Sequence, residues 1–274
     1  MRTILLFNDN SREAENAAAF ALDIAQKMKA DILILNLCDD VLVENKQTVT
    51  AGEQLSAENS DSFNLVKQLC TITTDGTFRP VVNDMNGSDF TKKNICELVI
   101  GKNIWLMVRG IETNATHRSL SNINVQAVLN RVACPLLLVP GNYKKRGFEN
   151  ITYAVDMRYC RTAVLKFLAE FAREYSANLV VEHFSAKGLP PLSDDYAATL
   201  FESEITNKIF YDKTYFNNIK ERNLEVAVDV MINSLHADLL ALVNHRFHFE
   251  ELFGQCINDT LPEHIPVPVI VFPL

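Results

Sequence analysis

Residues 132 to 156 read VACPLLLVPGNYKKRGFENITYAVD: an apolar run, a polar and basic joint, and a second apolar run. The first run returns near the C-terminus, where residues 267 to 273 read VPVIVFP. The second run, ITYAVD, is similar to ILLFND at residues 4 to 9. The last apolar run of the chain thus also occurs directly before a copy of the first one, which indicates one unit present twice. Such a repeat limits the possible folds more than any single residue does.

The two copies share one register through their first strand and helix. Asp9 and Asp156 lie 147 residues apart, and the same offset carries the apolar stripe after Asp9 onto the one after Asp156. The first stripe comprises Ala17, Phe20, Ala21, Ile24, Ala25 and Met28, and the second Val164, Phe167, Leu168, Phe171, Ala172 and Tyr175. The i, i+3, i+4, i+7 spacing predicts an amphipathic helix in each copy.

Strands and helices alternate along both copies, which is typical of a parallel sheet covered on both faces. In the first copy we predict strands at residues 3–8, 31–37, 78–83, 103–109 and 136–139, with later helices at 88–97 and 119–131. In the second copy we favour residues 208–211 as the third strand and 216–235 as the helix after it. A strand at 224–228 is the alternative, but it leaves a short crossover to the next strand.

We therefore predict an α/β fold of two tandem, doubly wound, five-stranded parallel sheets, Rossmann-like and similar to the adenine nucleotide alpha hydrolases. The first domain covers residues 1–142 and the second 148–274, with a linker at 141–147. Ligands of such sheets bind at the carboxyl ends of the strands, where the strand order reverses. The turn after the first strand and the loop after the fourth are thus the places for a site.

The excess of acidic over basic residues argues against two classes of binding partner. The chain carries 34 acidic and 26 basic residues, a net charge of −8, and 48% of its residues are hydrophobic. This acidity argues against nucleic acid and against an anionic membrane surface as partners. With no apolar run of about 20 residues and no signal peptide, we expect a cytoplasmic protein. We expect its partner to be another protein or a small molecule.

The chain resembles a tandem universal stress protein, two domains of that family fused. The resemblance rests on the strand, Asp and polar turn at Asn8-Asp9-Asn10-Ser11 and at Val155-Asp156-Met157-Arg158, and on the closing runs at 134–140 and 268–273. In single-domain relatives the fifth strands pair across a dimer. The resemblance thus implies an intramolecular pseudo-dimer, alone or as a homodimer of such units. Its interface residues are Leu136, Leu137, Leu138 and Val139 in one copy and Val269, Ile270, Val271 and Phe272 in the other.

The family's ATP-binding members share a loop after the fourth strand that reads Gly-x2-Gly-x9-Gly-Ser/Thr, and an Asp after the first strand contacts the adenosine. Glycines there let backbone N–H groups approach the phosphates. The first copy has Gly110, then Thr113, then Asn122 with Ile123 at the closing pair. The second copy has Val243 and Arg246 at the first two positions and Gln255 with Cys256 at the last, with Gly254 one residue away. The Asp is present twice, whereas the loop is eroded in both copies.

The candidate ligand residues lie in these turns and loops: Asp9, Asn10, Gly110, Asn122, Asp156, Asn244 and Gln255. Asp9 and Asp156 are either ligand contacts or caps of the following helix, and we favour the cap. His245, His248 and Glu251 invite a metal hypothesis, but no fourth ligand is at hand, so we predict no metal site.

The leading hypothesis is a non-enzymatic stress-response regulator that acts by binding and lacks the usual ATP site. The sequence has no Gly-x-Ser-x-Gly elbow, Walker loop, His-Glu-x-x-His or GxGxxG after the first strand, so no catalytic residue is predicted. The alternative is an ATP- or AMP-binding regulator that uses the crevice beside Asp9 and Gly110. The third hypothesis is a small hydrolase or transferase on the same fold.

Overall fold

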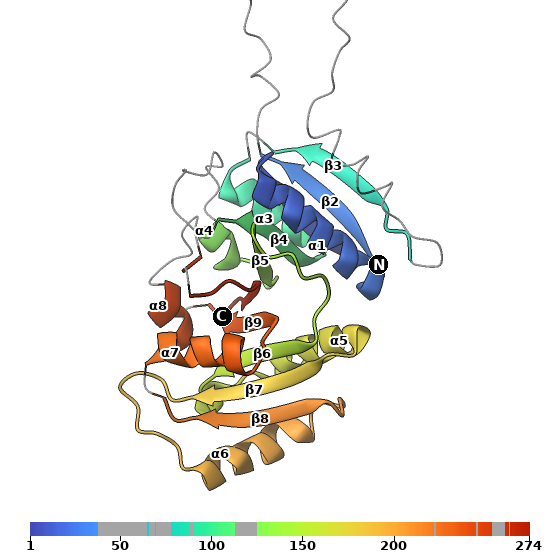
Figure 1. Ribbon diagram of the computed structural model, residues 1–274. Coiled ribbons are helices and arrows are strands. Elements are labelled where there is room, and N and C mark those ends of the chain that lie inside the picture. Colours follow the sequence, from blue (N-terminus) through green and yellow to red (C-terminus); the bar gives the residue numbers. More distant parts are fainter. Residues whose placement is uncertain are drawn as a thin grey trace, which may run out of the picture.

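The described residues form one ten-stranded sheet in the order β3-β2-β1-β4-β5-β10-β9-β6-β7-β8 (Figure 1). The computed structural model describes residues 1–37, 65, 69, 78–87, 90–112, 125–221, 223–244, 246–253, 261–262 and 264–274. The strands are β1 (Arg2–Asn8), β2 (Ala30–Asn36), β3 (Val82–Asn86), β4 (Ile104–Ile111), β5 (Leu136–Pro140), β6 (Asn150–Val155), β7 (Asn178–Phe184), β8 (Thr214–Ile219), β9 (Leu239–Val243) and β10 (Val269–Phe272). The first half, β1 to β5, and the second half, β6 to β10, therefore have the same internal order.

The two halves meet where β5 pairs with β10. This pairing is antiparallel, with Leu137 opposite Ile270, whereas every other pairing between the described strands is parallel. The interface residues predicted from the sequence thus lie side by side. Our expectation of two separate sheets is corrected to one continuous sheet. Both strands are buried along their whole length, and an unpaired apolar edge of this kind would be open to foreign strands.

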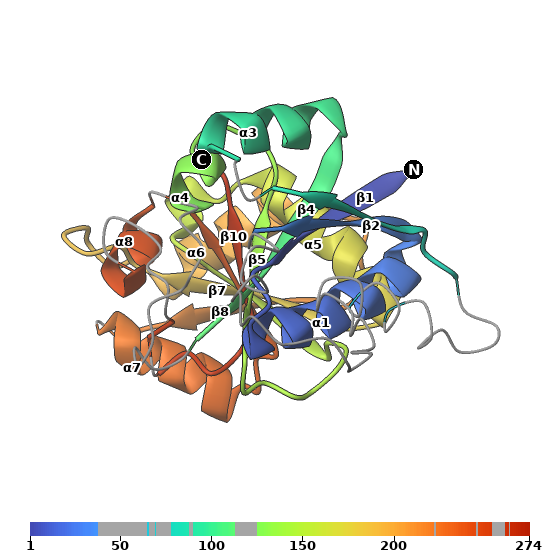
Figure 2. The ribbon, with the colours of Figure 1, turned by 90° about the horizontal axis from the view of Figure 1, so that it is seen from above.

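Helices cover both faces of the sheet (Figure 2). One face packs against α1 (Arg12–Met28) and α5 (Thr162–Tyr175), and the other against α3 (Lys92–Gly101), α4 (Val125–Leu129), α7 (Leu224–Asp229) and α8 (Phe247–Phe253). Near the β8 edge lies α6 (Asp194–Phe201); one 3-10 turn, η2 (Met157–Tyr159), follows β6, and the π-helical turns η3 (Glu202–Thr206) and η4 (Val230–Ser234) extend α6 and α7. Each of the two hydrophobic cores draws residues from both halves.

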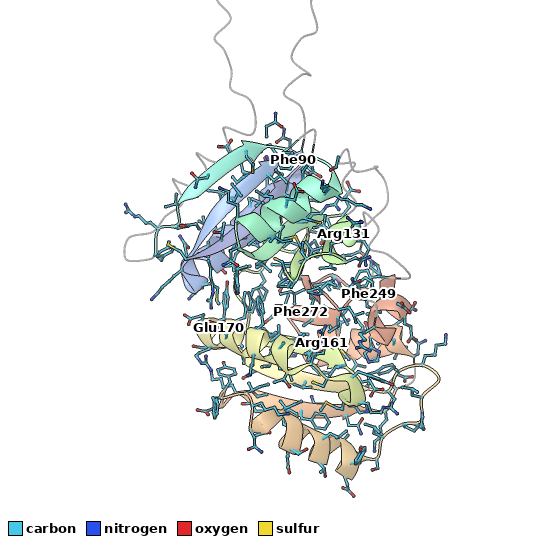
Figure 3. The ribbon with its side chains drawn as sticks, turned by 180° about the vertical axis from the view of Figure 1, so that it is seen from behind. Phe90, Arg131, Arg161, Glu170, Phe249 and Phe272 are labelled. Atoms are coloured by element: carbon cyan, nitrogen blue, oxygen red, sulfur yellow. The ribbon has the colours of Figure 1, made fainter. Side chains whose placement is uncertain are left out.

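Aromatic side chains join the halves on the α1 and α5 face. Trp105 of the first half stacks on Phe167 of the second with ring centroids 4.9 Å apart, and Phe167 meets the Phe272 ring edge-on at 5.3 Å. Phe272 lies between the two halves, and Glu170 projects from α5 at the same level (Figure 3). Arg2 of the first half pairs with Glu170 and lies over the Trp105 ring. The halves are therefore held by packing as well as by the sheet.

The repeat predicted from the sequence matches the structure through the first two strands and the first helix of each half. All six residues of the first stripe are buried, and four of the second are buried while Phe167 and Tyr175 are partly buried. The third strand of the first half was placed too early, since β3 is Val82–Asn86. The next helix begins after Thr91, whose backbone N–H and hydroxyl both donate to Asn94 Oδ1, so the predicted start at Ser88 is wrong.

The third strand of the second half is also corrected. Neither residues 208–211 nor residues 224–228 form it, because β8 spans Thr214–Ile219 and 224–229 are helical. As an edge strand, β8 pairs with β7 alone and its residues are half-buried or exposed, so it shows no apolar run. Asn223 instead begins α7, because its Oδ1 accepts from the N–H groups of Glu225 and Val226.

None of the helices in the described part of the chain is long and apolar enough to span a bilayer.

Candidate functional site

Each half has a crevice where its strand order reverses. The reversal lies between β1 and β4 in the first half and between β6 and β9 in the second. Open parallel sheets bind ligands at the carboxyl ends of these strands. Asp9 directly follows β1 and Gly110 is the last residue but one of β4, while Asp156 and Asn244 directly follow β6 and β9.

In the first crevice Asp9 serves the local turn. Its Oδ1 accepts hydrogen bonds from the Ser11 backbone at 3.2 Å and the Ser11 hydroxyl at 2.5 Å. Ser11 is the N-cap of α1, since its Oγ accepts from Ala14 N at 3.1 Å. Asn10 is exposed with φ of 58°, a left-handed conformation that Asn tolerates. The cap predicted for Asp9 is therefore made by Ser11, with Asp9 orienting it.

Gly110 has a packing reason to be glycine. A Cβ at this position would lie 2.2 Å from the carbonyl carbon and oxygen of Glu13, so the first turn of α1 crosses directly over the end of β4. The Glu13 side chain then covers Gly141, where a Cβ would lie 2.8 Å from its carboxylate. The crevice of the first half is thus closed by its own helix at the point where the glycine loop begins.

In the second crevice Asp156 is buried and fully engaged. It is 3% exposed, and Arg158 grips both carboxylate oxygens, with Nε at 2.8 Å from Oδ1 and Nη2 at 2.5 Å from Oδ2. The backbone N–H groups of Arg158 and Ala186 donate to it as well. Burial acts to raise its pKa, but these donors outweigh burial and the pKa of Asp156 is lowered. Asp156 caps the 3-10 turn η2 and not α5, whose N-cap is Arg161, so the cap predicted for the first helix of this half lies one turn earlier.

His183 lies beside Asp156 at the end of β7 and is fully buried. Its Nδ1 lies 3.2 Å from the Met157 backbone nitrogen and 3.3 Å from the Val155 carbonyl oxygen, and its Nε2 lies 3.5 Å from the Ser185 hydroxyl. Burial lowers the pKa of His183, so the ring is neutral at pH 7. Because Nδ1 contacts backbone atoms of Met157 and Val155 while the Asp156 carboxylate is bonded to Arg158 and Ala186, the set does not have the Asp–His bond of a catalytic triad.

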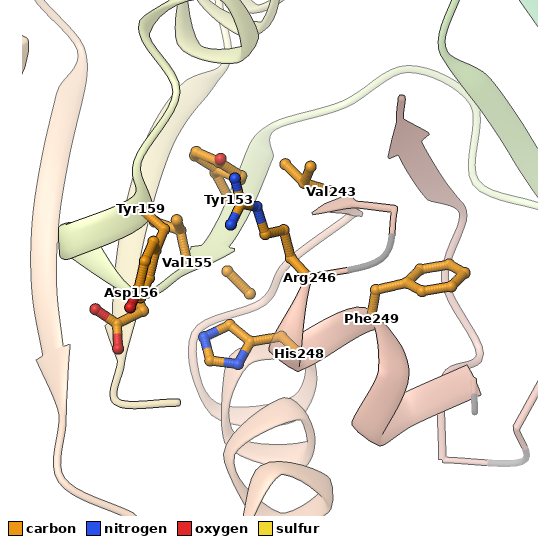
Figure 4. Close-up of a pocket in the computed structure, with 9 residues that line it drawn as sticks. Tyr153, Val155, Asp156, Tyr159, Val243, Arg246, His248 and Phe249 are labelled. Atoms are coloured by element: carbon orange, nitrogen blue, oxygen red, sulfur yellow. The ribbon is translucent and has the colours of Figure 1, made fainter. Parts of the chain in front are cut away.

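A small recess lies between the ends of β6 and β9 (Figure 4). Its cavity volume is about 20 Å³, the space of about one water molecule, whereas ligand pockets occupy about 300 to 1,000 Å³, so the recess is filled by its own side chains in this structure. Its polar lining comes from Tyr153, Asp156, Arg246 and His248, and its apolar lining from Val243, Phe249 and neighbouring residues. The guanidinium carbon of Arg246 lies 5.5 Å from the centre of the Tyr159 ring.

One buried polar atom of this recess, Arg246 Nε, has no hydrogen-bond partner within the described part of the chain. Tyr153 and His248 interact with the backbone of Arg161 and of Phe184. Tyr153 is fully buried and His248 is 4% exposed. Burial lowers the pKa of His248 to about 4, despite the opposing effect of the Asp156 carboxylate, so its ring is neutral at pH 7. Burial likewise raises the pKa of Tyr153, which keeps its hydroxyl protonated.

Asn244, a predicted ligand residue, lies in a contact between the halves. It is fully buried, its Oδ1 accepts from Gln126 Nε2 at 2.6 Å, and its Nδ2 donates to Asn130 Oδ1 at 2.7 Å. The loop after β9 is thus tied to α4 of the first half. The predicted residues Asn122 and Gln255 lie outside the described residues.

Two further features were weighed as sites. The metal hypothesis included His245, which lies outside the described residues. Within the described residues, no group of three side chains that could hold a metal ion occurs. A larger depression of about 1,020 Å³ borders residues 185–194 and 218–221. Among its charged residues, Asp194 already pairs with Lys220 at 2.6 Å in an exposed position, so this pair offers a ligand no free charge.

A sequence model of the universal stress protein family matches residues 1–140, just over half of the 274 residues. The chain belongs to the universal stress protein family. Solved structures share the fold of this universal stress protein at low identity. One is described as a universal stress protein from Archaeoglobus fulgidus and has a TM-score of 0.58 at 13% identity. The match covers 98% of this chain and 97% of that one. Another, described as a functionally unknown protein from Pseudomonas aeruginosa, has a TM-score of 0.56 at 14% identity, with coverage of 99% of this chain and 92% of that one. No curated protein matches the sequence.

Sequence reasoning missed Tyr153 and His183 in this universal stress protein, because both lie within strands read as apolar runs. The repeat offers one signal: His183 is 147 residues after Asn36, and both are polar residues at the end of the second strand of their half. Arg246 was recognised only as a substitution for glycine. In the structure the Arg246 side chain lines the recess between β6 and β9, where a glycine would leave space.

Proposed function

We propose that this universal stress protein is a tandem, non-enzymatic regulator of the stress response that acts by binding and does not hold ATP in the manner of the family's ATP-binding members. Two domains, residues 1–142 and 148–274, correspond to two fused family units, joined by the linker at 141–147. The identical strand order of the halves supports this division. So does the match of nearly the whole chain to a solved universal stress protein of similar length.

The observation that carries the absence of an ATP site is the place of Arg246. Counted from Val243, it stands at the second glycine of the ATP loop, and its side chain lines the recess that the phosphates would need (Figure 4). Glycine is used there because any side chain separates the backbone N–H groups from the phosphates. In the first half Gly110 is retained, but the contact with Glu13 explains it without a nucleotide.

The test is the unfolding temperature of the purified chain with and without millimolar ATP and Mg²⁺. A ligand at 100 times its dissociation constant stabilises the folded state by about 2.7 kcal/mol, a readily measured shift. We expect no shift. A clear shift would favour the alternative, an ATP- or AMP-binding regulator, and Asp9→Asn and Asp156→Asn variants would then show which crevice is used.

The proposal also assigns β5 and β10 the role that strand pairing between subunits has in single-domain relatives. Leu138 opposite Val269 and Leu136 opposite Val271 complete the pairing begun by Leu137 and Ile270. Because this edge is used within the chain, we expect a monomer of 30.9 kDa in light scattering. A compact dimer of such units is the alternative assembly. Two separate lobes in small-angle X-ray scattering would contradict the pseudo-dimer.

A further inference from the structure

Glu182 lies in β7 and is fully buried, which is rare for a carboxylic acid. One of its oxygens, Oε1, accepts a hydrogen bond of 2.9 Å from Asn217 Nδ2 of the neighbouring strand β8. The other oxygen, Oε2, is buried and has no hydrogen-bond partner among the described residues. The second half thus keeps an acid inside its sheet with one oxygen unused.

Within the described part of the chain, Glu182 forms no ion pair. Burial raises its pKa and the Asn217 amide lowers it, and burial has the larger effect, so the pKa of Glu182 is raised. An ionised carboxylate in this place would lose its hydration without gaining a cation as partner. The neutral acid is therefore the form that suits the folded chain.

The elements around Glu182 supply no counter-ion. Its side chain points to the face of the sheet that α7 and α8 cover, because it alternates with His183 and shares a side with Phe184. The titratable side chains of the neighbouring elements on this face all lack a positive charge at pH 7; they are Tyr215 of β8, Glu225 and Asp229 of α7, and His248, Glu250 and Glu251 of α8.

Glu182 lies next to the strand of this half that is easiest to displace. As the outermost strand, β8 pairs with β7 alone, so water reaches the carboxyl group when this one strand moves. At the end of β8, Asn218 and Lys220 bond to Asp194 of α6 at 2.7 and 2.6 Å. The position of β8 therefore also sets the position of α6 and of one wall of the depression of about 1,020 Å³.

We propose that Glu182 is a proton-operated lock on the outer edge of the second half. In its neutral form the acid holds β8 against β7, and ionisation favours local opening of β8 together with α6. The Asn217 amide serves both forms: its Nδ2 group donates to the carboxylate, and after a half-turn its Oδ1 accepts the proton of the neutral acid. Acidification therefore tightens this edge and the wall of the depression, an effect opposite in sign to that of His248.

The lock weakens as pH rises. Because the pKa of Glu182 in the folded chain is raised above its ordinary value of about 4.3, the open state loses its proton at lower pH than the closed state does. The contribution of the lock is complete below about pH 4.3. From there to the folded pKa, the open fraction should rise by about tenfold for each pH unit and then become constant.

The experiment follows amide hydrogen exchange in β8 and α6 of the full chain between about pH 4.5 and 8, corrected for the intrinsic exchange rate. A carbon NMR titration of the Glu182 carboxyl group is recorded beside it. We expect this group to titrate clearly above 4.3 and the open fraction of β8 to rise up to the same midpoint. A carboxyl group that titrates near 4.3, or an open fraction that does not change with pH, would overturn the proposal.

Two variants and a control locate the effect. Glu182→Gln keeps the size of the side chain and an oxygen acceptor but does not ionise, so the opening of β8 should become independent of pH. Asn217→Asp places a second carboxyl group beside Glu182, so the midpoint of the Glu182 titration should move to higher pH. Glu225→Gln, at an exposed position of α7, should leave both readings unchanged. The parental pH dependence in Glu182→Gln, or an unmoved midpoint in Asn217→Asp, would refute the lock.

Discussion

Gln126 Nε2 donates a hydrogen bond of 2.6 Å to Asn244 Oδ1, and both side chains are buried where the first half meets the second. Gln126 belongs to α4, and Asn244 directly follows β9. The bond therefore fixes the position of the loop after β9, the loop that in ATP-binding relatives surrounds the phosphates. In this chain that loop is held from outside by the other half.

Asn244→Ala should reduce the free energy of unfolding by about 1 to 3 kcal/mol, because it leaves the buried Gln126 amide without this partner. Urea denaturation measures the change. Asn233→Ala is the control, since its exposed amide donates to the exposed Asp229 carboxylate, and it should change stability far less. Equal effects of the two substitutions would show that the contact between the halves does not contribute.

Gly110→Ala should destabilise the fold by about 1 to 3 kcal/mol, because the new methyl group would overlap the Glu13 backbone and α1 would have to move. Gly101→Ala is the matched control: no atom lies within 4 Å of its Cβ position, and the residue ends α3. Alanine favours a helix over glycine by up to about 1 kcal/mol, so this variant should be neutral or more stable. Gly110→Ala with unchanged stability would mean that α1 does not press on β4.

Asp156→Asn should cost about 3 kcal/mol of stability, since it removes one partner of a buried ion pair. Asp9→Asn is the equivalent change in the first half and should cost much less, because both bonds from Ser11 reach a single oxygen that asparagine keeps. The lowered pKa of Asp156 means that its contribution is complete above the pKa of an unfolded Asp, about 3.9, and is lost as pH falls through the lower folded value. Similar losses for both variants at pH 7 would contradict this asymmetry.

His248 gives acid sensitivity at a higher pH. Its pKa is about 4 in the folded chain and about 6.5 when unfolded, so the unfolded state binds the proton first and stability falls as pH drops from 6.5 towards 4. The loss should reach about 2 kcal/mol by pH 4.5. His248→Gln should flatten the dependence of unfolding free energy on pH in this window, whatever its effect at pH 7. The exposed His236→Asn control should keep the parental slope, and an unchanged slope in His248→Gln would refute the assignment.

The sequence predicted the parts of the fold that depend on local pattern. The doubled register of α1 and α5 could be read because both helices present a regular apolar stripe to the sheet. It failed at β8, where an edge strand with half-exposed residues has no such pattern. The pairing of β5 with β10, which makes one sheet of the two expected, followed only from the resemblance to relatives whose fifth strands pair, because the two segments lie more than 100 residues apart and neither segment alone indicates its partner.

The candidate site was less accessible to sequence reasoning. Asp9 and Asp156 occupy equivalent positions, yet Asp9 orients a local turn while Asp156 is buried beneath Arg158. The difference depends on Arg158 and on the Ala186 N–H, which reaches Asp156 from a loop 30 residues later. The complete burial of Tyr153 at the end of the crevice arises from three-dimensional packing, which no spacing of residues reveals.

The antiparallel joint between β5 and β10 has a consequence for how this protein can evolve. In a symmetric assembly of identical subunits, every substitution appears in both binding clefts at once. Here the halves belong to one chain, so the first loop position can be Gly110 on one side and Val243 on the other. The two clefts can therefore differ from each other, and every molecule contains one of each. No second kind of subunit has to associate with the first.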